Sequence, residues 1–109
     1  MKQSHLFIAQ SLTTPTVIDY STGLPVIQPN VAFNAAVQSL FVMSIEDPVS
    51  ALEVIYYAAD HADDESTLDI LTAGPLETLL RWHGPSLSET IQRYCAQSPV
   101  FRSMVEGAA

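Results

Sequence analysis

The sequence predicts a mainly α-helical protein: a compact bundle of about six short helices, preceded by an extended or β-hairpin-like segment. From residue 31 onward, apolar residues recur at helical spacing, and prolines and glycines separate the runs. Before that point, residues 14–30 contain three prolines and a turn-like Ser-Thr-Gly. The chain has 109 residues, of which 48% are hydrophobic and 15% charged. Such a composition suits one folded domain. We expect a single domain over 1–109, with an extended segment at 1–30 and a helical body at 31–109.

The N-terminal segment TPTVIDYSTGLPVIQPN, residues 14–30, has β-favouring runs on both sides of its turn. We expect residues 16–20 and 24–28 to pair as two short strands. Pro25 would confine the second strand to an edge, because proline lacks the backbone N–H that a central strand needs. The alternative is an extended coil that packs on the helical body.

The first two helices are predicted from their N-terminal signals. Asn30 is typical of an N-cap, and its helix is expected to end near Ser44. The apolar face of this helix consists of Phe33, Val37, Leu40 and Phe41. Asp47 followed by Pro48 is typical of a second N-cap and first helical position. The apolar face of the second helix consists of Val49, Leu52, Ile55, Tyr56 and Ala59.

Glycine and proline divide the rest of the chain. DDESTLDILTAG predicts a short third helix that ends at Gly74, and Pro75 opens a fourth that ends at Gly84. SLSE, residues 86–89, is typical of a capping box and predicts a fifth helix. A Ser-Pro pair at residues 98–99 begins the sixth.

Charge is distributed unevenly along the chain. The net charge is −8, and neither lysine nor arginine occurs between Lys2 and Arg81. The acidic residues in that interval are Asp19, Glu46, Asp47, Glu53, Asp60, Asp63, Asp64, Glu65, Asp69 and Glu77. A surface of this kind attracts basic proteins and repels nucleic acid, which is bound through cations. We therefore expect a basic protein partner and no direct binding of nucleic acid.

The sequence DHADDE, residues 60–65, holds the densest group of carboxylates. It lacks the tight glycine turn and the closing glutamate of a calcium loop, and no second histidine stands near His61. We interpret it as the solvated start of a helix on an acidic surface. The residues predicted to bind the partner are Glu53, Asp60, Asp63, Asp64, Glu65, Asp69 and Trp82. Trp82 is either an exposed interface anchor or is covered by the N-terminal segment.

Catalysis is not predicted, and we expect no catalytic residue, no metal and no cofactor. His83 is expected to bond the terminal carbonyls of its helix. Cys95 is the only cysteine, and we expect it to act as a small apolar residue. Nucleotide-binding and serine-hydrolase motifs are absent. An enzyme or metal protein built on His61 or His83 is the alternative.

Localisation follows from the apolar stretches. LFIA after Lys2 is shorter than the apolar core of a secretory signal, and the uncharged residues 31–45 are too few and too polar to span a bilayer. We expect a soluble cytoplasmic protein without membrane contact. The uncharged region 20–45 is also the candidate surface for a homodimer.

Two segments, LTAGPLETLLRWHG (71–84) and SETIQRYCAQSPVFRSMVEG (88–107), resemble a family of small bacterial helical domains of unknown function. The positions that carry the resemblance are Ala73 to Glu77, Leu79, Leu80, His83, Gly84, Pro99, Phe101 and Arg102. The first thirty residues lie outside it. The resemblance implies a helical fold, a bacterial or phage source and a likeness to immunity proteins of toxin systems. We expect Glu77 and Arg102 to pair with each other or with helix ends.

The leading hypothesis is a non-enzymatic acidic protein that neutralises a basic effector such as a nuclease. An immunity protein or an antitoxin fits this description. One alternative is a phage-encoded inhibitor, such as an anti-CRISPR protein or another mimic of nucleic acid. The other is a structural protein that assembles as a homo-oligomer.

Overall fold

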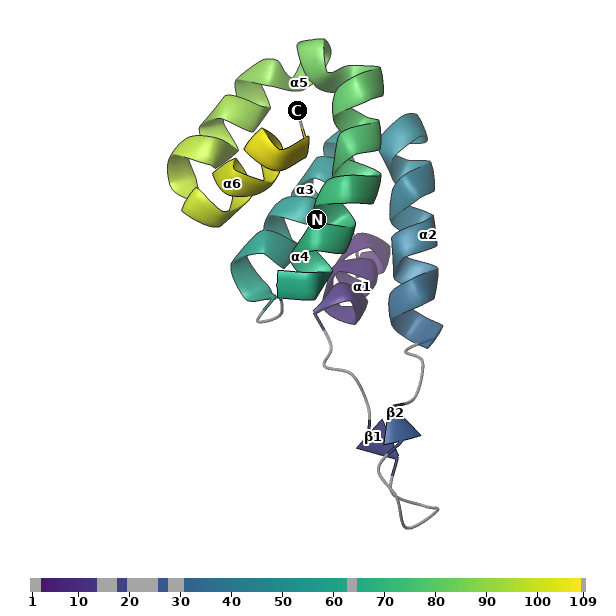
Figure 1. Cartoon of the computed structure of the whole chain (residues 1–109). Helices are drawn as coiled ribbons and strands as arrows, with labels where there is room; N and C mark the ends of the chain where they lie inside the picture. The colour runs from purple at the N-terminus through teal and green to yellow at the C-terminus, as the bar shows by residue number, and fades with distance from the viewer. Residues whose placement is uncertain (1–2, 14–17, 20–25, 28–30, 63–64, 109) are drawn as a thin grey trace.

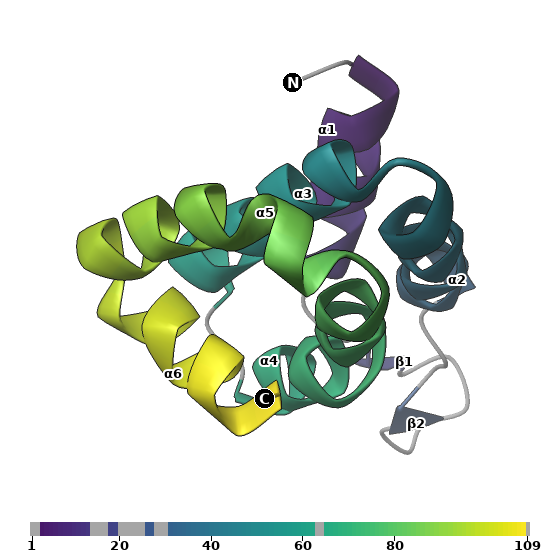
Figure 2. The same cartoon turned by 90° about the horizontal axis from the view of Figure 1, so that it is seen from above.

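The computed structural model describes residues 3–13, 18–19, 26–27, 31–62 and 65–108. Its elements are α1 (Gln3–Leu12), β1 (Ile18–Asp19), β2 (Val26–Ile27), α2 (Val31–Glu46), α3 (Pro48–His61), α4 (Glu65–Leu71), the π-helical turn η1 (Thr72–Leu76), α5 (Glu77–Gln97) and α6 (Pro99–Ala108). The helices pack closely together, while β1 and β2 extend away from them (Figures 1 and 2). The prediction of a compact, mainly helical protein is confirmed.

One apolar core joins the helices, and α1, α2, α3, α4, η1, α5 and α6 all contribute to it. Its largest fully buried side chains are Leu12, Leu40, Leu52, Ile55, Leu71, Leu76, Leu79 and Phe101. The burial of each such side chain contributes roughly 1.5–3 kcal/mol. Ser44, which is also fully buried, donates its hydroxyl hydrogen to the Leu40 carbonyl at 2.8 Å. Within the described ranges, every buried side-chain nitrogen or oxygen has a hydrogen-bond partner.

Helix α1 corrects the prediction that residues 1–30 form an extended segment. Ala9 and Leu12 are buried, Ile8 packs against the core, and α1 lies against α2 and α3. Its first turn has no acidic residue and its last turn no basic one. The helix is therefore marked only by the spacing of a few apolar residues, and tertiary packing stabilises it.

The two strands pair antiparallel, with Ile18 opposite Ile27 and Asp19 opposite Val26. The pairing lies within the predicted strand ranges 16–20 and 24–28, whose other residues are outside the described part of the chain. Asn30, predicted to cap α2, is outside it as well.

The boundary between α2 and α3 falls at Asp47, as predicted. Its N–H donates to the Met43 carbonyl at 2.8 Å, and its own carbonyl accepts from the Ala51 N–H at 3.0 Å. Pro48 occupies the first turn of α3, but the Asp47 carboxylate makes no capping hydrogen bond. The backbone of this residue, rather than its side chain, links the two helices. Val49, predicted to be buried, is exposed.

The helical backbone continues without a break from Glu65 to Gln97, through α4, η1 and α5. Gly74 and Pro75 were predicted to end one helix and begin the next, but both lie inside η1. A π-helical turn accommodates an extra residue, which is one way to fit a proline ring that would clash in a regular helix. Counted as continuous runs, the described residues form five helices instead of the predicted six.

Burial explains why the chain continues through η1. Leu71 before the proline, and Leu76 and Leu79 after it, are all fully buried. Three such side chains contribute roughly 1.5–3 kcal/mol each. An internal proline costs about 3 kcal/mol. The burial of a continuous helical face therefore outweighs the local penalty at Pro75.

The second glycine–proline joint, at Gly84 and Pro85, also lies inside a helix. Helix α5 changes direction near its middle instead of ending (Figure 1). The predicted capping box is wrong, because the Ser86 hydroxyl donates to the His83 carbonyl at 2.9 Å. Proline and serine at this point are typical of a helix bend.

Candidate functional site

The C-terminal end of α3 and the helix α4 carry an acidic corner, defined here as Asp60, Glu65 and Asp69. All three residues are exposed, and none forms an ion pair with another described residue. Glu65 and Asp69 are one turn apart and share a face of α4. Asp60 lies in the last turn of α3, the helix that precedes α4 in the chain. The corner is a set of unpaired negative charges open to solvent.

Two further residues of the predicted site, Asp63 and Asp64, belong to the connection between α3 and α4 and lie outside the described residues. Helix α4 begins at Glu65. Of the three acidic residues expected at the start of this helix, Glu65 is in its first turn, where the helix dipole favours a carboxylate.

Glu53 is not part of the acidic corner. It lies two turns before Asp60 on α3 and is half-buried. Its carboxylate is one of the groups that raise the pKa of the Tyr94 hydroxyl on α5. Of these two residues predicted to bind the partner, only Asp60 is therefore fully exposed, although residues seven apart lie on the same face of a helix.

Next to Glu53, three rings form an aromatic junction, defined here as Tyr56, Tyr94 and Phe101. Tyr56 stacks on Tyr94 with ring centroids 4.3 Å apart, and both rings meet the fully buried Phe101 edge-on at 5.7 Å. The Tyr56 hydroxyl donates to Oε1 of Gln97 at 3.3 Å. The junction therefore joins α3, α5 and α6.

The surroundings of Tyr94 change its acidity. Burial raises the pKa of the hydroxyl, and the carboxylate of Glu53 raises it further. Tyr56 adds to the rise, whereas Arg93 lowers the pKa. Tyr94 is thus held as a neutral phenol.

Helix α6 begins as the sequence predicts. Ser98 is buried, and its Oγ accepts a hydrogen bond from the Phe101 N–H at 3.2 Å. This is the geometry of an N-cap, followed by Pro99 at the first helical position. The cap holds Phe101 in place inside the aromatic junction.

Trp82, the last residue of the predicted site, lies far from the acidic corner. It is 64% exposed, in agreement with the alternative of an exposed anchor. The neighbouring His83 donates from Nε2 to the Ile45 carbonyl at 2.8 Å, at the end of α2 where α3 begins. Asp60 lies at the other end of α3. A helix of 14 residues is about 20 Å long, so the predicted residues form two separate surfaces.

His83 corrects a sequence prediction as well. It was expected to bond the terminal carbonyls of its own helix. Instead it bonds a carbonyl in the last turn of α2 and lies within the continuous helix α5. An imidazole N–H in this position satisfies a C-terminal carbonyl of α2 and holds α2 against α5.

None of the three arginines of the C-terminal third forms an ion pair with the acidic corner among the described residues, and Arg93 forms no ion pair with any of them. Arg81 pairs with Glu77 at 3.2 Å, and Arg102 pairs with Glu106 at 3.1 Å. Both pairs are formed within one helix turn, so Glu77 and Arg102 pair neither with each other nor with helix ends. Such local pairs form readily because residues four apart are neighbours on a helix.

The reactive side chains have structural settings. Burial raises the pKa of the Cys95 thiol, against a lowering by Arg102, so the reactive thiolate is disfavoured. His61 stacks on Tyr57 with centroids 4.0 Å apart, and its Nδ1 lies 2.9 Å from the Tyr57 carbonyl. Among the described residues, no three histidine, cysteine or acidic side chains are grouped closely enough to hold a metal ion.

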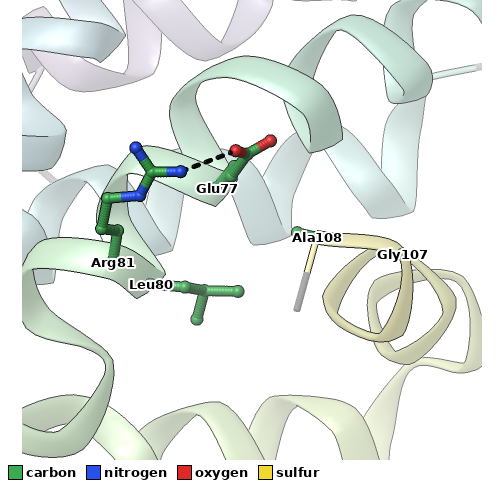
Figure 3. Close-up of a pocket in the computed structure, with 5 residues that line it drawn as sticks. All are labelled: Glu77, Leu80, Arg81, Gly107 and Ala108. Carbon is green, nitrogen blue, oxygen red and sulfur yellow. Dashed lines mark hydrogen bonds and ion pairs between the residues drawn. The ribbon is translucent and has the colours of Figure 1, made fainter.

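A groove of about 500 Å³ lies between α5 and the end of α6 (Figure 3). Its lining residues are Glu77, Leu80, Arg81, Gly107 and Ala108. The Glu77–Arg81 ion pair borders it, and Leu80 extends between the two helices (Figure 3). None of these side chains is a nucleophile, and the two charged groups are paired with each other. The groove is therefore lined by apolar residues, and the two charged side chains at its border neutralise each other.

Apolar side chains are exposed on α2 and on α5, within the region 20–45 and at Trp82, both of which the sequence offered as candidate interaction surfaces. Phe41 was assigned to the buried face of α2, yet it is 39% exposed, and Ile45 beyond it is 46% exposed. A Cβ added to Gly74 would lie 2.8 Å from the Phe41 ring, so a glycine at this point lets η1 approach α2 closely. For these side chains, the sequence prediction was wrong only in placing Phe41 on the buried face of α2.

No helix in the part of the chain that the structure describes combines the length and the apolar character needed to cross a membrane. No curated protein and no solved structure gives a significant match to the chain. A family model described as a family of unknown function (DUF6869) matches residues 29–108, which is well over half of the chain. The match is broader than the resemblance in segments 71–84 and 88–107. The chain therefore belongs to this family of unknown function, DUF6869.

Proposed function

We propose that the protein is a non-enzymatic acidic binding protein that neutralises a basic protein, in the manner of a toxin immunity protein or an antitoxin. The observation that carries this proposal is the acidic corner. Asp60, Glu65 and Asp69 are exposed and unpaired among the described residues, while Arg81 and Arg102 are engaged in pairs of their own. Charges left unpaired by the fold are available to a partner.

The corner would act mainly on the rate of encounter. Clustered charges of one sign steer an oppositely charged protein toward them and can raise association rates about tenfold or more at low salt. Screening over a Debye length of roughly 8–10 Å weakens this effect at physiological ionic strength. We therefore expect binding that depends strongly on salt.

Asp60 gives this proposal separate support. It lies in the last turn of α3, where the helix dipole disfavours a carboxylate by about 0.3–1 kcal/mol. Within the fold, no described cation pairs with it. A role in binding a basic partner accounts for a charge that local helix stability does not.

The first experiment identifies the partner by affinity capture from lysate of the native host, at low and at high salt. A basic protein retained at low salt and released at high salt agrees with the proposal. Recovery of only the protein itself at both salt concentrations contradicts it and favours self-assembly.

The second experiment measures association rates with the captured partner. The triple variant Asp60→Lys, Glu65→Lys, Asp69→Lys should associate about tenfold more slowly or worse at low salt. A matched pair, Asp69→Lys and Glu89→Lys, changes the net charge equally at two exposed positions, on α4 and α5. A larger effect of Asp69→Lys assigns binding to the corner. Equal effects would show that only overall charge matters.

A further inference from the structure

The seam between α2 and α5 exposes three large apolar side chains, which we call the seam patch: Phe41, Ile45 and Trp82. Phe41 and Ile45 are one turn apart on α2. The Phe41 ring lies against Gly74 at the start of the seam, and the His83 ring reaches the Ile45 carbonyl at its end. Trp82, next to His83, is therefore beside Ile45.

The orientation of α5 agrees with this placement. Leu80 and Arg81 border the groove on the side of α6. Successive residues on a helix are rotated by about 100°, so Trp82 turns away from that groove toward the flank where α2 lies. The two faces of α5 thus differ: one borders a groove with a neutralised rim, and the other carries the seam patch.

Negative charge adjoins the patch. Glu46 and Asp47 directly follow Ile45, and neither forms an ion pair with a described residue. The C-terminal end of α2 adds the negative pole of its helix dipole. Arg81, which precedes Trp82 in the chain, is already paired with Glu77. An occupant of the patch therefore meets an apolar surface beside uncompensated negative charge.

We propose that the seam patch is a docking site for an apolar side chain flanked by lysine or arginine on a basic protein partner. Aromatic and aliphatic anchors of this kind dominate the energy of many interfaces. A second copy of this chain is a poor occupant, because it would bring another Glu46 and Asp47 and a net charge of −8. The inference rests on the proposed function only in taking the partner to be basic, since the patch is separate from the acidic corner.

Trp82 is the only tryptophan in the chain, so its fluorescence reports on the patch directly. The probe is a synthetic helical peptide of leucine and lysine without aromatic residues. Binding at the patch should shift Trp82 emission to shorter wavelength and protect it from quenching by acrylamide. A peptide with serine in place of leucine, of the same charge, should do neither. Peptide binding without any change at Trp82 would overturn the proposal.

Substitutions inside and outside the seam patch test whether the peptide binds there. Ile45→Ser should weaken peptide affinity about tenfold, as expected for the loss of one buried aliphatic anchor. The matched control is Val100→Ser, because Val100 is 42% exposed and lies on α6, outside the seam between α2 and α5. Equal loss in the two variants would overturn the proposal.

A second pair of variants separates this inference from the proposed function. Loss of peptide binding in Asp69→Lys, with Ile45→Ser unaffected, would place binding at the acidic corner and overturn the seam patch as the site. The opposite pattern supports the seam patch even where the corner fails. Sedimentation of the free protein completes the test, because a stable dimer that Ile45→Ser dissociates would make a second copy the occupant and overturn a basic one.

Discussion

The aromatic junction and the acidic corner both involve α3, yet one buries its polar groups and the other exposes them. At the junction, α5 and α6 pack on α3 through Tyr94 and Phe101, and Glu53 lies half-buried beside Tyr94. At the corner, two turns further along α3, Asp60 is exposed and unpaired in the described part of the chain. Two acidic residues of the same helix, Glu53 and Asp60, therefore differ in exposure. The difference depends on whether other helices pack around them.

The largest loss of stability is expected from a substitution in the aromatic junction. Phe101→Ala removes a fully buried ring that contacts Tyr56 and Tyr94, and should lower the free energy of unfolding by about 3–5 kcal/mol. Urea denaturation measures this loss. Its neighbour Val100 is exposed, so Val100→Ala should cost less than about 0.5 kcal/mol. A loss of under 1 kcal/mol for Phe101→Ala would contradict the observed packing.

A smaller effect is expected at the seam. His83→Ala removes the hydrogen bond to the Ile45 carbonyl and should destabilise the protein by about 0.5–1.5 kcal/mol. His83→Gln keeps an N–H donor and should lose less. His61→Ala serves as the control, because its ring contacts lie within the exposed last turn of α3. Equal stability of wild type and His83→Ala would rule out the link between α2 and α5.

Charge reversal in the acidic corner should change the free energy of unfolding only slightly. The change should have opposite signs at the end of α3 and at the start of α4. Asp60→Lys replaces a carboxylate at the C-terminal end of α3 and should stabilise the fold by about 0.3–1 kcal/mol. Glu65→Lys places a cation at the N-terminal end of α4 and should destabilise it by a similar amount. Denaturation at low salt shows both changes, and high salt should reduce both. The same sign for both variants would disprove the dipole argument.

The smallest effect concerns titration at the junction. Because the pKa of Tyr94 is raised above its ordinary value of 10.0, its contribution to stability is fully present below pH 10.0 and is lost as the pH rises through the folded-state pKa. Glu53→Gln removes one cause of the rise, so tyrosinate absorbance should appear at lower pH. Tyr94→Phe identifies the signal of this residue among the four tyrosines. An unchanged titration in Glu53→Gln would remove Glu53 from the environment of Tyr94.

Much of the helical structure was predictable from local signals. Asp47 with Pro48, and Ser98 with Pro99, mark helix starts that the structure retains. Helix α1 was not predicted, because its ends lack charged residues that favour the helix dipole. The stop signals at Gly74 and Gly84 misled for another reason. At the first joint Pro75 costs about 3 kcal/mol, and the burial of Leu71, Leu76 and Leu79 outweighs it, whereas at Gly84 the helix bends instead of ending.

The candidate site was predictable in composition and less so in arrangement. Asp60, Glu65 and Asp69 are close in sequence and are exposed on the consecutive helices α3 and α4. Glu53 and Trp82 do not join them, because Glu53 is half-buried two turns earlier on α3 and α5 carries Trp82 to the other end of α3. No pattern in the local sequence shows which helix will cover a given face.

By itself, the sequence determined the helical class, the absence of lysine and arginine between positions 2 and 81, and the acidic connection after α3. These properties depend on residue types and on neighbours within one or two helix turns. Only the tertiary structure decided that Tyr56, Tyr94 and Phe101 meet, that His83 binds the end of α2, and that Phe41, Ile45 and Trp82 are exposed. Those contacts join residues far apart in the chain. They depend on how the continuous helix from Glu65 to Gln97 bends and packs, which is set by the burial of the whole core.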